Sequence, residues 1–83
     1  MTMSNNSAEN KSLEYYLALP YSILLVPDED GWYAEIPELP GCMTGGETQA
    51  EALELIEDAK RSWLKVSLAH GDPIPEPEHS RVR

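Results

Sequence analysis

The chain has 83 residues, of which 41% are hydrophobic and 25% are charged, a composition typical of one small globular domain. Fifteen acidic residues against six Lys and Arg give a formal net charge of −9, which argues against an extended nucleic-acid-binding surface because each phosphate contact needs a cation. A single cysteine excludes an intrachain disulfide. No apolar run reaches the roughly 20 residues that span a bilayer, and no signal peptide is visible. We therefore expect a cytoplasmic protein.

The two ends of the chain are predicted to lie outside the folded domain. Residues 1–12 are rich in Ser and Asn and hold no aromatic or β-branched apolar residue, so we expect a mobile tail. Prolines at alternate positions of residues 73–77 forbid a helix and favour an extended path. Residues 78–83 are expected to fray. The domain is therefore expected to cover residues 13–77.

The first half of this domain predicts an antiparallel hairpin. Residues 13–19 (LEYYLAL) fit either a short helix or the start of an extended run. Residues 21–26 are apolar and β-branched, as in a strand, and residues 32–36 form the returning strand. The connection at residues 28–31 (DEDG) has turn chemistry, with Gly31 able to adopt a positive φ.

A rigid turn follows the hairpin. Residues 37–41 (PELPG) contain two prolines and a glycine, which stop the strand and reverse the chain. Residues 42–44 are then predicted to be a short third strand, because two glycines follow at once.

A long helix is predicted over residues 49–70. Thr48 and Glu51 form a capping box at its start, and Gly71 occupies the position of a left-handed C-terminal cap. Its acidic residues gather in the first half and its basic residues later, which complements the helix dipole. The apolar spacing predicts that the face turned to the sheet is formed by Ala52, Leu53, Ile56, Ala59, Trp63 and Val66, with Leu55 and Leu64 away from its centre.

Two motifs at a fixed separation resemble the HicB family of antitoxins. They are P-E-L-P-G-C at residues 37–42 and T-Q-A-E-A-L at residues 48–53. The strand, glycine turn and aromatic strand of residues 23–36 precede them, and the G-D-P-I-P-E-P stretch of residues 71–77 follows. The resemblance covers residues 21–77, most of the chain.

The resemblance implies an α+β fold: a small three- to four-stranded antiparallel sheet with one long helix packed on it. The element order is β-β-β-α-β, described as partial ribonuclease-H-like, with residues 73–77 as the fourth strand or an extended edge. It also implies an antitoxin that binds a small basic mRNA-cleaving toxin of the HicA type and masks its RNA-binding and catalytic surface. Family members that bind DNA carry a further DNA-binding segment. Only six residues follow Pro77, so we expect no operator binding.

The toxin-binding residues are expected around the second strand and the rigid turn. Strand alternation turns either Trp32 or Tyr33 outward, where an aromatic ring is a favoured interface anchor. Glu35 and Glu38 would oppose the cations of an RNA-binding toxin, although acidic residues also serve solubility alone. The prolines would preorganise the turn, which also needs them to reverse the chain. The candidate contacts are Trp32, Tyr33, Glu35, Pro37, Glu38, Leu39 and Pro40.

No pattern in the sequence indicates catalysis. Glu35 is the only acid inside a predicted strand, so carboxylates do not converge on a metal as in ribonuclease-H-like nucleases. A nucleophilic Cys42 would need a nearby histidine, whereas His70 and His79 fall at the helix end and in the tail. We therefore expect no enzyme activity, no cofactor, no metal and no direct RNA binding.

The predicted core is thin and the strands are short, which favours a homodimer or a higher homo-oligomer. Two alternatives to the antitoxin function stay open at this point. One is a stand-alone HicB-like protein-binding module without a cognate toxin. The other is an operator-binding repressor, which would need a basic helix or ribbon that the sequence does not show.

Overall fold

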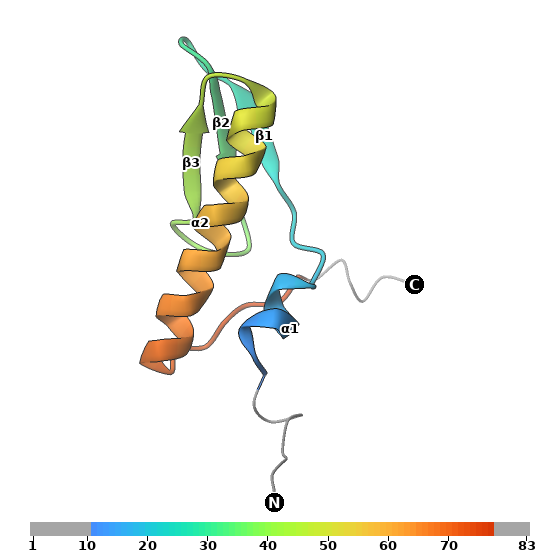
Figure 1. Ribbon diagram of the computed structural model, residues 1–83, viewed down its shortest axis with the longest axis vertical. Helices are drawn as coiled ribbons and strands as arrows, with labels where there is room; N and C mark the ends of the chain where they lie inside the picture. Colours follow the sequence, from blue (N-terminus) through green and yellow to red (C-terminus); the bar gives the residue numbers. More distant parts are fainter. Residues whose placement is uncertain (1–10, 78–83) are drawn as a thin grey trace, which may run out of the picture.

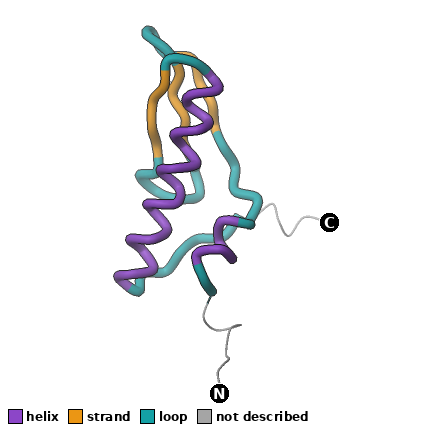
Figure 2. Tube along the Cα trace, in the orientation of Figure 1, coloured by secondary structure: helices purple, strands orange, loops and turns teal. Residues whose placement is uncertain are grey.

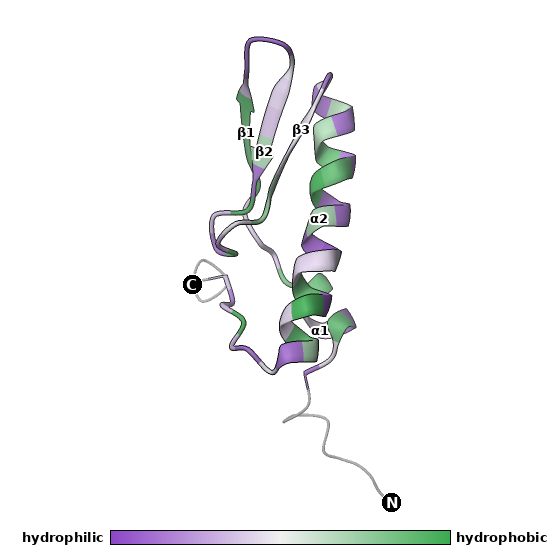
Figure 3. Ribbon diagram, turned by 90° about the vertical axis from the view of Figure 1, so that its left-hand side faces the viewer, coloured by the Kyte–Doolittle hydropathy of each residue, from purple (hydrophilic) through white to green (hydrophobic). Residues whose placement is uncertain are grey.

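The computed structural model describes residues 11–77. Of the expected tails at residues 1–12 and 78–83, residues 1–10 and 78–83 therefore lie outside the described residues. The elements, in chain order, are α1 (Leu13–Leu17), β1 (Leu24–Pro27), β2 (Trp32–Glu35), β3 (Met43–Gly46) and α2 (Gln49–His70) (Figure 1). The strands form an antiparallel sheet in the order β1-β2-β3, and α2 covers one face of it (Figure 3). This arrangement confirms the predicted α+β fold.

The β1–β2 hairpin forms as predicted, with Leu25 paired to Ala34. Its turn is closed by the N–H of Asp28, which donates to the carbonyl oxygen of Gly31 across 2.7 Å. Gly31 does not use the positive φ that glycine allows. Instead, a Cβ atom at this position would lie 2.3 Å from the carbonyl oxygen of Gly46, so glycine is needed for the close approach of two backbones.

Helix α2 begins and ends as predicted. The hydroxyl of Thr48 accepts from the N–H of Glu51 across 3.0 Å, and Gly71 has a left-handed φ of 70°. The second half of the capping box differs slightly, since the Glu51 carboxylate accepts from the N–H of Glu47 and not from that of Thr48. Both ends of the helix are therefore capped by local interactions.

The buried face of α2 is rotated from the predicted one. It consists of Ala52, Ile56, Lys60, Leu64 and Ser67, whereas Leu53 and Val66 are exposed. Lys60 can occupy this face because its aliphatic stem is buried and its ammonium group pairs with Glu57 at 3.1 Å. The apolar spacing alone did not predict this face, because α2 packs against both the sheet and α1. Those two contacts together decide which residues of the helix are buried.

The fourth strand implied for residues 73–77 is absent from the described chain. These residues form an irregular segment that runs beside α1 (Figure 2). The hydroxyl of Tyr21 donates to the carbonyl oxygen of Pro75 at 2.5 Å, and Tyr15 and Lys11 both bind the Glu76 carboxylate. Alternate prolines lack the N–H groups that a strand ladder requires.

The structure also shows that residues 13–17 are helical, with Ser12 as the N-terminal cap.

The core lies between the sheet and α2, and it extends to α1 through the buried ring of Tyr16. Its fully buried aliphatic side chains include Ile36, Ile56 and Leu64. Within residues 11–77, neither helix has the length and hydropathy that a membrane crossing requires.

Candidate functional site

The face of the sheet turned away from α2 is not covered by any other described element (Figure 3). Because side chains alternate along a strand, the pairing places Leu24, Glu35 and Met43 in one row across this face. Val26 and Tyr33 form the next row. Leu24 is 48% exposed, Met43 46% and Val26 38%. We call these five residues the outer sheet face.

A carboxylate is held in place at the centre of the outer sheet face. The hydroxyl of Tyr33 donates to Oε1 of Glu35 across 2.9 Å and lies 3.5 Å from the sulfur of Met43. This hydrogen bond to Glu35, with burial and the carboxylate charge as smaller causes, raises the pKa of the Tyr33 hydroxyl. A carboxylate with apolar neighbours on both sides can pair with a cationic side chain of a partner while those neighbours exclude water.

The two aromatic residues of β2 point to opposite faces, as the alternation predicts. Trp32 packs against the core on the α2 side, and Tyr33 belongs to the outer sheet face. Of these two candidate contacts, Tyr33 is therefore the one that is available on the uncovered face.

The rigid turn at residues 37–41 is closed by backbone hydrogen bonds. The N–H of Leu39 donates to Ile36 at 3.0 Å, and the N–H of Cys42 donates to Leu39 at 2.9 Å. Gly41 takes a φ of 86°, which favours glycine. The side chain of Leu39, one of the candidate contacts, is fully buried in the core.

The remaining candidate residues divide between surface and scaffold. Pro37 and Pro40 are exposed on the turn. The Glu38 carboxylate accepts from the N–H and the hydroxyl of Ser22, and so it ties the segment before β1 to the turn. Of the two acids predicted to contact a partner, Glu35 is the one that lies on the outer sheet face.

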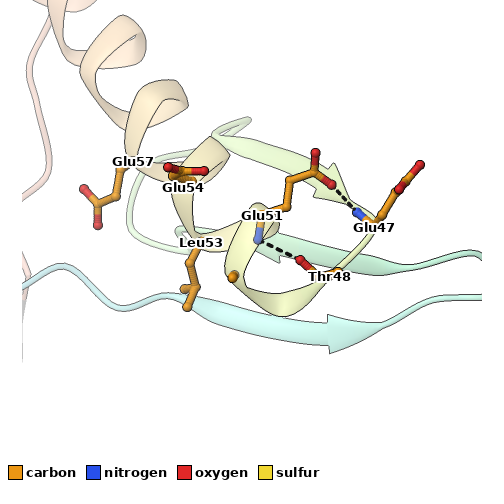
Figure 4. Close-up of a pocket in the computed structure, with 7 residues that line it drawn as sticks. Glu47, Thr48, Glu51, Leu53, Glu54 and Glu57 are labelled. Carbon is orange, nitrogen blue, oxygen red and sulfur yellow. Dashed lines mark hydrogen bonds between the residues drawn. The ribbon is translucent and has the colours of Figure 1, made fainter.

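Further acidic residues line a groove along the first half of α2 (Figure 4). This acidic groove has a volume of about 890 Å³ and contains Glu47, Glu51, Glu54 and Glu57 around the exposed Leu53. Its carboxylates do not converge, since no three His, Cys, Asp or Glu side chains of residues 11–77 could hold a metal ion together. The groove therefore adds negative charge to the surface beside the sheet.

Comparison with known proteins decides the family. Residues 21–82 match the sequence model of a protein family, the HicB-like antitoxin of bacterial toxin–antitoxin systems. The chain belongs to this family. The HicB-like chain is 40% identical over 58 residues to UPF0150 protein Ta0767 of Thermoplasma acidophilum, a match that covers 69% of this chain and 84% of the relative. It is 41% identical over 57 residues to Antitoxin HicB 2 of Photorhabdus laumondii, covering 69% of this chain and 41% of that protein.

A solved structure supports the same assignment. The protein TTHA0281 from Thermus thermophilus matches with a TM-score of 0.57 and 33% sequence identity, and the match covers 76% of each chain. The family assignment suggests a regulatory role without catalysis.

The cysteine of the HicB-like domain is a core residue. Cys42 is 2% exposed, and burial raises the pKa of its thiol, an effect that the charge of Lys60 partly offsets. His70 is exposed at the end of α2, and His79 lies outside the described residues. A protonated, buried thiol is a poor nucleophile.

Sequence reasoning missed three apolar members of the outer sheet face, which are Leu24, Val26 and Met43. A signal was present, because strand alternation relates Leu24 and Val26 to each other on one side of β1. The sequence did not reveal that this side would stay uncovered, since that depends on where α2 packs.

Proposed function

We propose that this HicB-like chain is an antitoxin that binds a small, basic, mRNA-cleaving toxin of the HicA type and masks its RNA-binding and catalytic surface. The observation that carries the proposal is the outer sheet face, where Tyr33 holds Glu35 among exposed apolar side chains. Family membership and the net charge of −9 support it. Since such a toxin acts on mRNA, the proposal includes a cytoplasmic location.

The proposed interface uses two kinds of interaction. The apolar side chains of Leu24, Val26 and Met43 supply affinity through burial, at roughly 25 cal/mol per Å² of apolar surface. Glu35 pairs with a Lys or Arg that the toxin otherwise presents to an RNA phosphate. The exposed Pro37 and Pro40 extend the contact at the adjoining turn.

The acidic groove acts at longer range. Its four glutamates, Glu47 before α2 and the other three in the first half of the helix, attract a basic toxin before contact. This attraction is screened over about 8 Å at physiological ionic strength, so the association rate should fall as salt is added.

The test is a binding titration of the full chain with the small basic protein encoded next to it, by isothermal calorimetry. Glu35→Lys should raise the dissociation constant by at least about 30-fold, because it places like charges together at a desolvated contact. Asp58→Lys is the matched control, since it makes the same change of charge at an exposed position of α2 and should leave the constant within about threefold.

Growth rescue provides the functional readout. Coexpression of the wild-type chain should restore growth that the toxin arrests, and Glu35→Lys should reduce the rescue. Equal affinities for the two variants, both folded by circular dichroism, would remove the outer sheet face from the interface. Absence of binding and of rescue would instead favour a stand-alone protein-binding module, and a specific gel shift with operator DNA at physiological salt would favour a repressor.

A further inference from the structure

The Tyr33 hydroxyl on the outer sheet face lies between two acceptors. It donates to Oε1 of Glu35 across 2.9 Å, and the sulfur of Met43 is 3.5 Å from the hydroxyl oxygen. Gly45, which pairs with Tyr33, has no side chain that could separate the ring from the sulfur. A hydroxyl has one hydrogen, and a carboxylate is a stronger acceptor than a thioether. Tyr33 therefore holds Glu35 as long as the Met43 side chain accepts weakly.

The acceptor strength of the Met43 side chain changes when its sulfur is oxidised. With hydrogen peroxide as the oxidant, the thioether sulfur loses two electrons and forms a bond to one peroxide oxygen. The O–O bond breaks, and the second oxygen takes the proton of the transferred oxygen and leaves as water. The product is a polar sulfoxide, which methionine sulfoxide reductases convert back to the thioether. Met43 is 46% exposed, so a peroxide can reach its side chain.

The sulfur of the preceding residue is protected from the same oxidant. Cys42 belongs to the core and is 2% exposed. Burial raises the pKa of its thiol, and the charge of Lys60 offsets this effect in part. Peroxide reacts with an accessible thiolate and slowly with a buried thiol. The fold therefore exposes one of two adjacent sulfur-containing residues and shields the other.

A sulfoxide oxygen at Met43 competes with the Glu35 carboxylate for the Tyr33 hydroxyl. Met43 and Glu35 are paired across β3 and β2, so the negative end of the S=O bond faces the carboxylate. Like charges directly opposite each other in a sheet repel, which drives the carboxylate away from this position. The Glu35 side chain is half-buried, so water can replace the hydroxyl as its donor. Oxidation therefore favours transfer of the hydroxyl from Glu35 to Met43.

We propose that Met43 is a reversible oxidation site that controls the hydrogen bond between Tyr33 and Glu35. Peroxide converts the Met43 side chain to the sulfoxide, whose oxygen accepts from the Tyr33 hydroxyl and releases the Glu35 carboxylate. The consequence for binding rests on the proposed function. The oxidised outer sheet face has one apolar side chain fewer and a carboxylate that Tyr33 no longer holds, so its affinity for the toxin falls until a reductase restores the thioether.

The first test needs no toxin. The full chain is treated with hydrogen peroxide, and mass spectrometry of its peptides locates the added oxygen. Met43 should become the sulfoxide at a peroxide concentration that leaves Cys42 a thiol. Carbon NMR of labelled tyrosine, with Tyr33 assigned by Tyr33→Phe, then follows the titration of its hydroxyl. The hydrogen bond to Glu35 raises the pKa of Tyr33 in the untreated chain, so oxidation should lower this pKa.

Met43→Leu is the matched control for the treatment. The variant keeps an apolar side chain of similar size at this position and still contains Met1 and Met3, which peroxide can also oxidise. Peroxide should therefore leave the Tyr33 titration of Met43→Leu unchanged.

The second test measures toxin binding by isothermal calorimetry, with the peroxide removed before the toxin is added. Oxidation should raise the dissociation constant of the wild-type chain by about tenfold, because it places a polar group among apolar side chains at the contact. Treatment with a methionine sulfoxide reductase should reverse the change. Treated and untreated Met43→Leu should bind alike, whatever the affinity of this variant.

A Met43 sulfoxide in a chain that stays folded by circular dichroism, with a lower pKa of Tyr33, would support the proposal. Oxidation of Cys42 before Met43, unfolding of the oxidised chain, or a Met43 sulfoxide with an unchanged Tyr33 titration would overturn it. Toxin affinity that survives the sulfoxide would overturn the regulatory role. If the untreated chain does not bind the toxin, the proposed function fails, and the mass and NMR measurements still decide whether Met43 controls the hydrogen bond.

Discussion

The indole N–H of Trp63 donates to the carbonyl oxygen of Pro40 across 2.8 Å. This hydrogen bond joins the middle of α2 to the rigid turn between β2 and β3. The turn carries exposed prolines next to the outer sheet face. The bond therefore holds this part of the proposed binding surface in a fixed position relative to α2.

Trp63→Phe should therefore lower the free energy of unfolding by about 1–2 kcal/mol, because it removes the N–H that donates to the carbonyl oxygen of Pro40. Urea denaturation monitored by circular dichroism measures the change. Trp32→Phe is the control, since it removes a similar ring and its indole makes no hydrogen bond with any of residues 11–77. If the two variants lose equal stability, the bond to Pro40 contributes nothing beyond packing.

Neighbouring glycines of β3 should respond differently to the same change. A Cβ atom at Gly46 would lie 2.7 Å from the backbone nitrogen of Ala52, because the end of β3 lies directly against the start of α2. Gly46→Ala should cost about 1–3 kcal/mol of stability through overpacking. At Gly45 the nearest atom would be the carbonyl oxygen of Trp32 at 3.6 Å, an ordinary contact, so Gly45→Ala should change stability by less than about 0.5 kcal/mol. Thermal unfolding of both variants measures the difference. A larger loss of stability in Gly45→Ala than in Gly46→Ala would contradict this account.

The cap of α2 can be tested in the same way. Thr48→Ala removes the oxygen that accepts from the N–H of Glu51, and should destabilise the domain by about 1 kcal/mol. Thr48→Ser keeps the oxygen and should retain most of the stability. A loss of equal size in both variants, in urea denaturation, would show that the methyl group and not the hydroxyl matters.

Alkaline pH should weaken the contact between Tyr21, which precedes β1, and the segment that follows α2. Burial, followed by the charge of Glu76, raises the pKa of Tyr21 from 10.0 to about 12. Because the folded state favours the protonated hydroxyl, its stabilisation is fully present below pH 10.0 and is lost as the pH rises through about 12. Partial exposure limits the effect to about 1 kcal/mol.

Tyr21→Phe provides the comparison for this pH dependence. The variant lacks the hydroxyl that donates to Pro75, so it should be less stable than the wild type near neutral pH and should lose less stability on alkalinisation. Denaturant midpoints of both proteins on either side of pH 10.0 give the measurement. Parallel curves would show that another group causes the alkaline loss.

The elements that the sequence determined are those encoded by neighbouring residues. The cap at Thr48, the left-handed Gly71 and the hairpin turn are local interactions, so α2 was predicted at its observed bounds and the β1–β2 hairpin was predicted as a unit. Its first strand begins three residues later than predicted, at Leu24 in place of residue 21. The family motifs around Pro40 and Thr48 are local in the same sense. Strand alternation likewise predicted that Trp32 and Tyr33 point to opposite sides.

Tertiary structure decided which of the possible surfaces are buried. The predicted buried face of α2 ran from Leu53 to Val66, but a helix can turn about its axis by part of a turn when it packs. Contacts with both the sheet and α1 buried the face that contains Lys60 and Leu64 instead. The burial of Leu39 and the path of residues 72–77 also depend on segments distant in sequence. Burial is a property of packing between elements, and periodicity within one element cannot fix it.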